Sequence, residues 1–213
     1  MRQKVFRSAP TLAQFHVSEH NQLLIAGVDE AGRGPLAGAV FAAAVMLDRE
    51  QPLSGLDDSK KLSWQQREEL YDQIISRSLC YAVASVDARE IDRLNILQAS
   101  LLAMKRAVDK LVHVPQMVYV DGQHLPVWDY PAQAVIKGDS LLQAIAAASI
   151  LAKVSRDRDM LEQDRLYPCY GFAKHKGYPT SAHLQALRAY GPCAIHRQSF
   201  RPVAECTRQS RLK

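Results

Sequence analysis

The sequence lacks the features of a secreted protein, of a protein stabilised by a structural zinc ion and of a membrane-spanning protein. Its four cysteines form no Cys-x-x-Cys pair, and no histidine lies at zinc-finger spacing from two of them, so we expect thiols in a reducing compartment. Residues 1–20 contain no sustained apolar segment of the kind that a secretory signal needs. The longest apolar stretch, residues 141–152, is interrupted by Gln143 and Ser149 and is too short to cross a bilayer. These absences predict a cytoplasmic protein without a membrane anchor.

The composition is that of a globular chain. Of the 213 residues, 47% are hydrophobic, which is enough to bury a core without disulfides or metal ions. The formal net charge of +5 is compatible with a polyanionic partner such as nucleic acid, although many cytosolic proteins share such a balance. The sequence has no internal repeat or low-complexity tract, so its length indicates one large domain or a domain with a modest extension.

Apolar segments bounded by turn residues predict a sheet whose later strands alternate with helices. The expected strands cover residues 23–29, 37–47, 80–86, 117–120 and 134–136. The second of these segments has no polar face, which is typical of a strand buried on both sides. This order predicts the α/β class, with a mixed sheet flanked by helices.

Helical patterns fill most of the intervals between these strands. Ser63 and Gln66 fit a capping box at the start of a helix, and residues 91–112 have the apolar spacing of an amphipathic helix. A long helix is expected over residues 140–164 and a shorter one over residues 181–189. We therefore expect a helical C-terminal part that finishes in a loose, basic end.

Four acidic residues lie where predicted strands meet glycine-containing turns. Asp29 and Glu30 follow the first strand, and Asp121 and Asp139 follow the fourth and fifth. Functional sites in open α/β sheets form at strand ends, so three separate ends can bring these carboxylates together. Two unit charges about 4 Å apart repel by roughly 4 kcal/mol at an effective dielectric constant of 20, so such a cluster needs protons, cationic partners or bound metal. Oxygen ligands suit Mg²⁺ or Mn²⁺, and a pair of such ions is able to promote phosphodiester hydrolysis.

Each acid also has an interpretation without catalysis. Asp139 fits the N-cap of the long helix, and Asp121 followed by Gly122 fits an ordinary turn. Asp29 and Glu30 are harder to assign to structure alone, but adjacent strand residues point to opposite faces of a sheet. If both act in one site, the strand must bulge or end there, or Glu30 must contribute differently.

Six segments, in order, resemble the sequence blocks of bacterial type 2 ribonuclease H (ribonuclease HII). The first is Gly-Val-Asp-Glu-Ala-Gly-Arg-Gly-Pro-Leu-Ala-Gly and the last is His-Lys-Gly-Tyr-Pro-Thr. The six blocks cover residues 27–38, 57–62, 120–122, 137–140, 147–157 and 175–180. Any one block is weakly specific, but the ordered set over residues 23–192 is highly specific.

The resemblance implies a ribonuclease H-like fold with a central five-stranded mixed sheet. It implies an endoribonuclease that uses Mn²⁺ or Mg²⁺ to hydrolyse the phosphodiester 5′ to a ribonucleotide, in RNA–DNA hybrids and in duplex DNA with embedded ribonucleotides. A two-metal mechanism would leave 3′-hydroxyl and 5′-phosphate ends. We expect a monomer with a loose leader (residues 1–21), a catalytic domain (residues 22–192) and a basic tail (residues 193–213).

The matching blocks also imply roles for individual residues. The implied metal-binding catalytic carboxylates are Asp29, Glu30, Asp121 and Asp139. The implied substrate-binding residues are Gly32, Arg33, Gly34, Ser59, Lys60 and Tyr178. The glycine turn and the tyrosine would contact the ribose 2′-hydroxyl, which distinguishes RNA from DNA, and the serine and lysine would contact backbone phosphate.

Simpler interpretations compete with several of these roles. The glycine turn fits a plain connection between strands, Tyr178 fits a core or rim position, and Lys60 fits a solvated loop. His175 is not expected to be a ligand, and we expect Asp157 and Asp159 on a solvated helix face. Two other functions fit parts of the pattern. A junction resolvase would cleave all-DNA junctions, and a non-catalytic nucleic-acid-binding protein would bind with strong salt dependence and need no metal.

Overall fold

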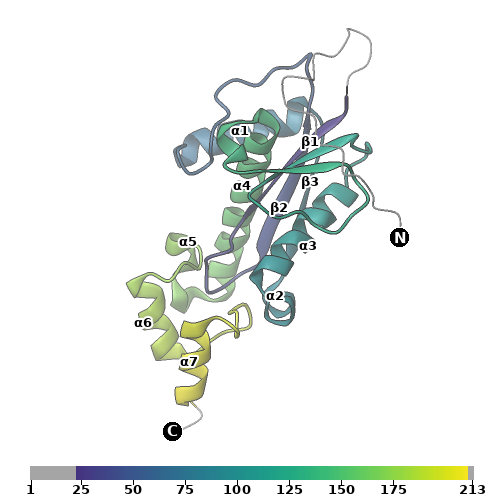
Figure 1. The fold of residues 1–213 in the computed structure, drawn as a ribbon. Helices are drawn as coiled ribbons and strands as arrows, with labels where there is room; N and C mark the ends of the chain where they lie inside the picture. Colours follow the sequence, from purple (N-terminus) through teal and green to yellow (C-terminus); the bar gives the residue numbers. More distant parts are fainter. Residues whose placement is uncertain (1–22, 211–213) are drawn as a thin grey trace, which may run out of the picture.

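A computed structural model describes residues 23–210, and the expected leader lies outside these described residues. The strands form one five-stranded sheet in the order β3-β2-β1-β4-β5 (Figure 1). Strand β2 pairs antiparallel with both β1 and β3, whereas β4 pairs in parallel with β1 and β5 pairs in parallel with β4. The strands are β1 Ile25–Ala31, β2 Val40–Leu47, β3 Ser78–Val86, β4 Met117–Asp121 and β5 Ala132–Val135. The prediction of a five-stranded mixed sheet is confirmed.

Helices cover both faces of this sheet and extend beyond one end of it (Figure 1). The α-helices are α1 Trp64–Arg77, α2 Ala88–Leu94, α3 Ile96–Asp109, α4 Gln143–Leu166, α5 Phe172–His175, α6 Ser181–Tyr190 and α7 Arg201–Ser210. Two 3-10 helices, η2 Gly138–Ser140 and η3 Pro168–Tyr170, flank α4. No helix among residues 23–210 is both long and apolar enough to cross a membrane.

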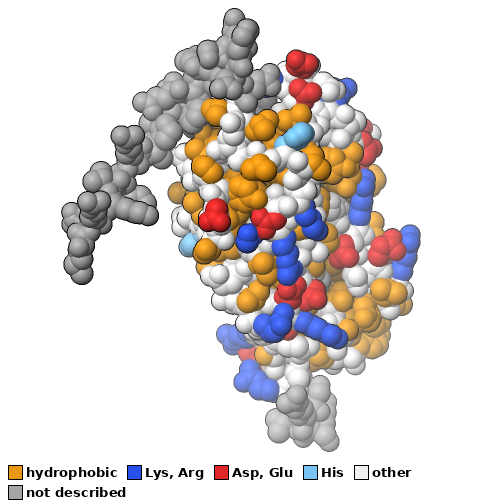
Figure 2. Space-filling view, turned by 90° about the vertical axis from the view of Figure 1, so that its right-hand side faces the viewer, with side chains coloured by type: hydrophobic (Ala, Val, Ile, Leu, Met, Phe, Trp, Pro, Cys, Tyr) orange, Lys and Arg blue, Asp and Glu red, His pale blue; other side chains and the backbone are white. Residues whose placement is uncertain are grey.

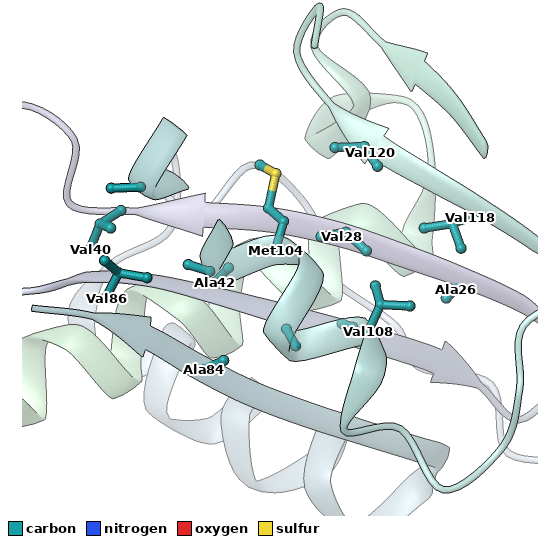
Figure 3. Packing of buried hydrophobic residues seen from close by; sticks show 14 of the residues in the cluster. Ala26, Val28, Val40, Ala42, Ala84, Val86, Met104, Val108, Val118 and Val120 are labelled. Carbon is teal, nitrogen blue, oxygen red and sulfur yellow. The ribbon is translucent and has the colours of Figure 1, made fainter. Parts of the chain in front are cut away.

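The alternation of side chains along the strands builds two separate cores. Val28, Ala42 and Val120 face α3, where they pack with Met104 and Val108 (Figure 3). The neighbouring positions on β2 face α4 and α1 and pack with residues of those helices. Because β2 is apolar at every position, it is buried on both faces, as its sequence predicts.

The helix boundaries follow local capping chemistry. Ser63 and Gln66 form the predicted capping box, with the Ser63 side chain accepting from the Gln66 amide and the Gln66 side chain accepting from the Ser63 amide. The single helix expected over residues 91–112 is instead two helices, because Asn95 has a φ of 70° and separates α2 from α3. The Asn95 side chain also caps α3 by accepting a hydrogen bond from the Gln98 amide.

A glycine in β1 lets the long helix approach the sheet closely. A Cβ at Gly27 would lie 2.1 Å from the backbone of Ala144 in the first turn of α4, so no larger residue fits this crossing. The close contact fixes the start of α4 and the preceding η2 beside the carboxyl ends of β1 and β4. It therefore decides where the acidic residues of these segments lie.

The C-terminal part packs as helices rather than as a loose end. Helices α6 and α7 share a small core in which Leu36, Leu187 and Val203 are buried. The expectation of a loose end is wrong for residues 201–210, because α7 places an apolar face against α6. Figure 2 shows lysine and arginine side chains gathered toward this end of the molecule, on the face seen from the right of Figure 1.

Candidate active site

Two of the acids come together because β1 and β4 are parallel neighbours. Val28 pairs with Val120, so the next residue of each strand, Asp29 and Asp121, lie beside one another at the carboxyl ends. Both follow residues that face α3 and therefore point to the α4 side of the sheet. Asp29 is buried, and Asp121 Oδ1 accepts a hydrogen bond of 2.7 Å from the Gly138 amide.

Asp139 joins them from the turn that precedes α4. It lies in the 3-10 helix η2 and is buried. The hydrogen bond from the Gly138 amide to Asp121 ties this turn to the end of β4. The N-cap interpretation of Asp139 is wrong, because the residue at the N-cap of α4 is Leu142, which offers no side-chain hydrogen bond.

Glu30 behaves as strand alternation requires. The pairing of β1 with β2 continues without a register shift from Gly27 to Ala31, so the strand neither bulges nor ends at Glu30. Its carboxylate accepts a hydrogen bond of 3.2 Å from Arg33, at the turn that follows the strand. Glu30 therefore reaches the strand end from the opposite face, beside the glycine turn.

Burial and mutual repulsion make the ionised form of these carboxyl groups unfavourable. Burial, then the charges of Glu30 and Asp121, raise the pKa of Asp29 well above its ordinary value. Burial also raises the pKa of Glu30 against the opposing effect of Arg33, and burial and nearby carboxylates raise the pKa of Asp139. Groups in this state favour a proton or a cation.

The chemistry of this donor set fits a divalent cation. Carboxylate oxygens are the ligands that Mg²⁺ and Mn²⁺ prefer, and burial and repulsion between carboxylates raise the pKa values of Asp29 and Asp139, which favours binding of a cation. Within residues 23–210, however, no three histidine, cysteine or acidic side chains stand close enough together to form a finished metal site. Side-chain rotation at the strand ends would have to complete it.

A cavity of about 360 Å³ opens beside the carboxylates and gathers all six predicted substrate-binding residues. Of the four acids, Glu30 alone lines it. Its remaining lining residues, Ala31, Ser149 and Lys153, were not among the predicted site residues. Ser149 and Lys153 lie one helical turn apart on α4, within a block that carries the family resemblance, and this i, i+4 spacing is the sequence signal that could have identified them.

The two loop residues of the cavity have different surroundings. Ser59 is buried, and its hydroxyl forms a hydrogen bond of 2.9 Å with that of Ser149. Lys60 is exposed at the cavity. Partial burial of its ammonium group lowers the lysine pKa, but the charges of Asp58, Asp29 and other carboxylates outweigh this effect, so the pKa is raised. Lys60 is therefore a cationic neighbour of the acidic cluster as well as a cavity residue.

The glycine turn is more than a plain connection. Gly32 has a φ of 100°, and a Cβ there would lie 2.1 Å from Nε of Arg156. Gly34 lies under Tyr178, whose ring would be 3.5 Å from a Cβ at that position, and Tyr178 is 41% exposed at the cavity rim. The turn and the tyrosine thus form one wall, backed by a buried arginine that sequence reasoning did not single out.

Three further polar residues of this region have structural partners. Asp157 is buried and pairs with Lys153 at 2.7 Å, so its expected place on a solvated face is wrong. Asp159 is half-buried, and burial raises its pKa. Both ring nitrogens of His175 are engaged, with the Tyr170 carbonyl and the Gly177 amide.

Comparison with solved structures defines the class of protein. Ribonuclease H2 from Pyrococcus horikoshii OT3 matches with a TM-score of 0.75 and 27% identity, over 90% of this chain and 100% of that one. Bst-RNase HIII matches with a TM-score of 0.68 and 18% identity, over 90% of this chain and 71% of that one, which shows the shared fold. The fold is therefore ribonuclease H-like, as predicted, and the protein is a nuclease of that class.

Comparison of sequences then gives the family. The family model for ribonuclease HII matches residues 26–203. A ribonuclease HII from Paracidovorax citrulli (strain AAC00-1) is 55% identical over 204 residues, which cover 96% of this chain and 85% of that protein. This chain belongs to the ribonuclease HII family and is a hydrolase with ribonuclease H activity. That result favours the ribonuclease H interpretation over a junction resolvase, which is a different nuclease, and over a non-catalytic binding protein.

Proposed function

We propose that this protein is a metal-dependent endoribonuclease that hydrolyses the phosphodiester 5′ to a ribonucleotide. The proposed substrates are RNA–DNA hybrids and duplex DNA with embedded ribonucleotides. One observation carries the proposal: a cluster of carboxylates at the ends of two parallel strands adjoins a cavity walled by a glycine turn and Tyr178. The first part suits phosphodiester hydrolysis, and the second suits selection of a ribose.

Asp29, Glu30, Asp121 and Asp139 are the residues that would hold the metal. The oxygen donors of all four and the raised pKa values of Asp29, Glu30 and Asp139 support this assignment. The structure of Bst-RNase HIII is a complex with Mn²⁺. When bound, two Mg²⁺ or Mn²⁺ ions would activate water and stabilise the leaving oxygen, which gives 3′-hydroxyl and 5′-phosphate ends. The carboxylates' own part is to place that chemistry at the edge of the cavity.

The cavity wall formed by the glycine turn and Tyr178 would recognise the ribose. Backbone groups of Gly32, Arg33 and Gly34 are able to approach a sugar closely, since glycines leave no side chain in the way. Tyr178 offers an aromatic face and a hydroxyl at the rim. A 2′-hydroxyl is the group that distinguishes RNA from DNA at a given position.

The cationic side chains of the cavity would bind the backbone phosphates. Lys60 is exposed there, and Lys153 lines the same cavity while paired with Asp157. Ser59 has its hydroxyl directed to Ser149, so its expected contact with phosphate would require that bond to be shared or exchanged. The monomeric state and the cytoplasmic location remain predictions.

The proposal is tested with a duplex that carries one ribonucleotide in an otherwise DNA strand, and with the matched all-DNA duplex. We expect one cut on the 5′ side of the ribonucleotide with Mn²⁺ or Mg²⁺, none with EDTA, and none in the all-DNA duplex. A polymerase that extends the upstream product would identify its 3′-hydroxyl. Cleavage that survives chelation, or equal cleavage of both duplexes, would contradict the proposal.

A further inference from the structure

The glycine turn is held from below by a segment near the C-terminus. Residues 195–197 pair with residues 36–38 through an antiparallel bridge between Ala37 and His196. The Gly38 amide donates to the Ile195 carbonyl at 2.9 Å, and the Arg197 amide donates to the Leu36 carbonyl at 2.8 Å. Segments separated by about 160 residues thus form one small ladder directly behind the cavity wall.

The side chain of Arg197 lies beneath the same turn. It is fully buried, and its guanidinium donates to three backbone carbonyls: Gly38 at 3.0 Å, Arg33 at 2.9 Å and Gly32 at 2.6 Å. Removing a cation from water is costly unless hydrogen bonds compensate it, and two of these three bonds end on the glycine turn itself. The planar fork of arginine holds three acceptors in a fixed arrangement, which a lysine is unable to do.

A second contact runs from the same segment to Tyr178. The Cys193 amide donates to Nδ1 of His196, so the proton of His196 is on Nε2, which lies 3.1 Å from Nε2 of His183. Nε2 of His183 accepts a hydrogen bond from this proton, so the proton of His183 itself is on Nδ1. From there it is donated to the Tyr178 carbonyl at 2.9 Å. Both histidines are buried, and burial lowers the pKa of His196 to about 4, which keeps this chain neutral.

We propose that residues 193–197 form the positioning element of the ribose-recognition wall. Arg197 fixes the carbonyls, and so the amides, of the Gly32–Gly34 turn, and His196 fixes the loop of Tyr178 through His183. The inference rests on the proposed recognition of a 2′-hydroxyl by that wall. The segment, which the sequence predicted to be part of a basic tail, would thus act in substrate selection through the wall that it positions.

The contacts of Arg156 support the same assignment of the wall as a fixed structure. Arg156 too is buried and donates to carbonyls on both sides of the wall, at Ala37 and Lys176, while its guanidinium carbon lies 5.8 Å from the centre of the Tyr178 ring. Its Nη1 atom is buried and has no hydrogen-bond partner within the part of the chain that the structure describes. Arg156 links the turn to the tyrosine loop, whereas Arg197 links the turn to the C-terminal segment.

The test separates positioning from simple stabilisation. Arg197→Lys keeps the charge but loses the fork, and His183→Gln leaves Arg197 in place while it breaks the contact with Tyr178. Ile74→Val, in the buried packing between α1 and α4, serves as a destabilised control that lies away from the wall. Urea unfolding of all three variants gives their stability, so each is assayed under conditions in which it is folded.

Two measurements then follow on each folded variant. The first is the ratio of Kd for the all-DNA duplex to Kd for the single-ribonucleotide duplex, by fluorescence anisotropy in EDTA, where no cleavage occurs. The second is the single-turnover rate at saturating substrate with Mn²⁺. We expect Arg197→Lys and His183→Gln to lower the binding ratio at least about fivefold and the rate at least about tenfold, with Kd for all-DNA duplex unchanged, because small misplacements of positioning groups are costly.

Other results would overturn the inference. Wild-type selectivity in both variants would show that the segment only stabilises the fold. An equal loss in Ile74→Val, or an equal loss of binding to both duplexes, would show the same. A wild-type protein that does not favour the ribonucleotide duplex would instead refute the proposed recognition of ribose, so the two failures are distinguishable.

Discussion

The acidic cluster and the cavity wall beside it are built on opposite physical principles. In the cluster, Asp29 and Asp139 are buried acids whose pKa values are raised by burial and by neighbouring carboxylates. In the wall, the turn that contains Gly32 is held by hydrogen bonds from Arg197, and Tyr178 is held through His183. The acidic cluster keeps repelling negative charges, whereas the wall is fixed by several independent hydrogen bonds.

This difference suggests a division of labour. Carboxylates that repel one another are stabilised when a cation binds, so their repulsion favours the metal-bound protein. A wall that must distinguish one hydroxyl group gains nothing from strain and needs fixed geometry instead. Changes to the acidic cluster should therefore abolish turnover without harming the fold. Changes that displace the buried glycine turn should reduce selectivity and stability together, whereas loss of the exposed Tyr178 side chain should reduce selectivity alone.

The largest effect is expected from Asp29→Asn. Turnover should fall by about a thousandfold or more, the order seen when a group that stabilises a transition state is removed. Because the pKa of Asp29 is raised in the folded state, the ionised carboxylate destabilises the metal-free protein above that pKa. The lost stability is regained as pH falls through this pKa and Asp29 takes up a proton. Asparagine carries no charge, so it removes this destabilisation at every pH. The free energy of unfolding in EDTA near pH 7 should therefore hold steady or rise.

Single-turnover cleavage and urea unfolding check this prediction, with exposed Asp129→Asn as the matched control. Mn²⁺ should raise the Tm of the wild type and of the control by more than that of Asp29→Asn. Near-normal turnover in Asp29→Asn would remove Asp29 from the site.

A smaller effect on turnover, joined to lost stability, is expected from Gly32→Ala. The new Cβ would lie 2.1 Å from Arg156 Nε, and a φ of 100° is strained for alanine. Stability should fall by about 1–3 kcal/mol, and cleavage of the single-ribonucleotide duplex by about a hundredfold. Gly55→Ala, at a similar φ of 81° but in open space, is the control for backbone strain alone. Equal activity in the two variants would show that the turn tolerates displacement.

The smallest effect is expected from Tyr178→Ala. The side chain is 41% exposed, so the free energy of unfolding should change little. The preference for the ribonucleotide duplex over all-DNA should fall by about tenfold, the size of one lost stacking contact. Tyr190→Ala, an exposed tyrosine on α6, provides the comparison. Unchanged selectivity would place ribose recognition in the turn alone.

Most of the sheet could be predicted, because local patterns specify it. Period-two and fully apolar segments mark the strands, and Ser63 with Gln66 marks the start of α1. The break at Asn95 could not be predicted from apolar spacing, since the spacing continues through it and only the backbone angle interrupts the helix. The apolar face of α7 was overlooked beside its many charged residues.

The site could be predicted in its members but not in its arrangement. The acids follow strands, so their positions at strand ends are visible in the sequence. That Asp29 lies beside Asp121 depends on the parallel pairing of β1 with β4, a contact between segments about ninety residues apart. Lys153, Arg156 and Arg197 were missed as site residues because a lysine or arginine has the same appearance in the sequence whether it is solvated or buried.

The sequence by itself determined the fold class, the family and the acidic pair Asp29 and Glu30, because these depend on local chemistry and on ordered motifs. The tertiary structure decided that the two acids stay on opposite faces of an unbroken strand. It also decided that residues 195–197 lie beneath a turn formed at residues 32–38. The physical reason is that strand pairing and burial join distant segments, and hydrogen bonds such as those of Arg197 exist only once that chain geometry is complete.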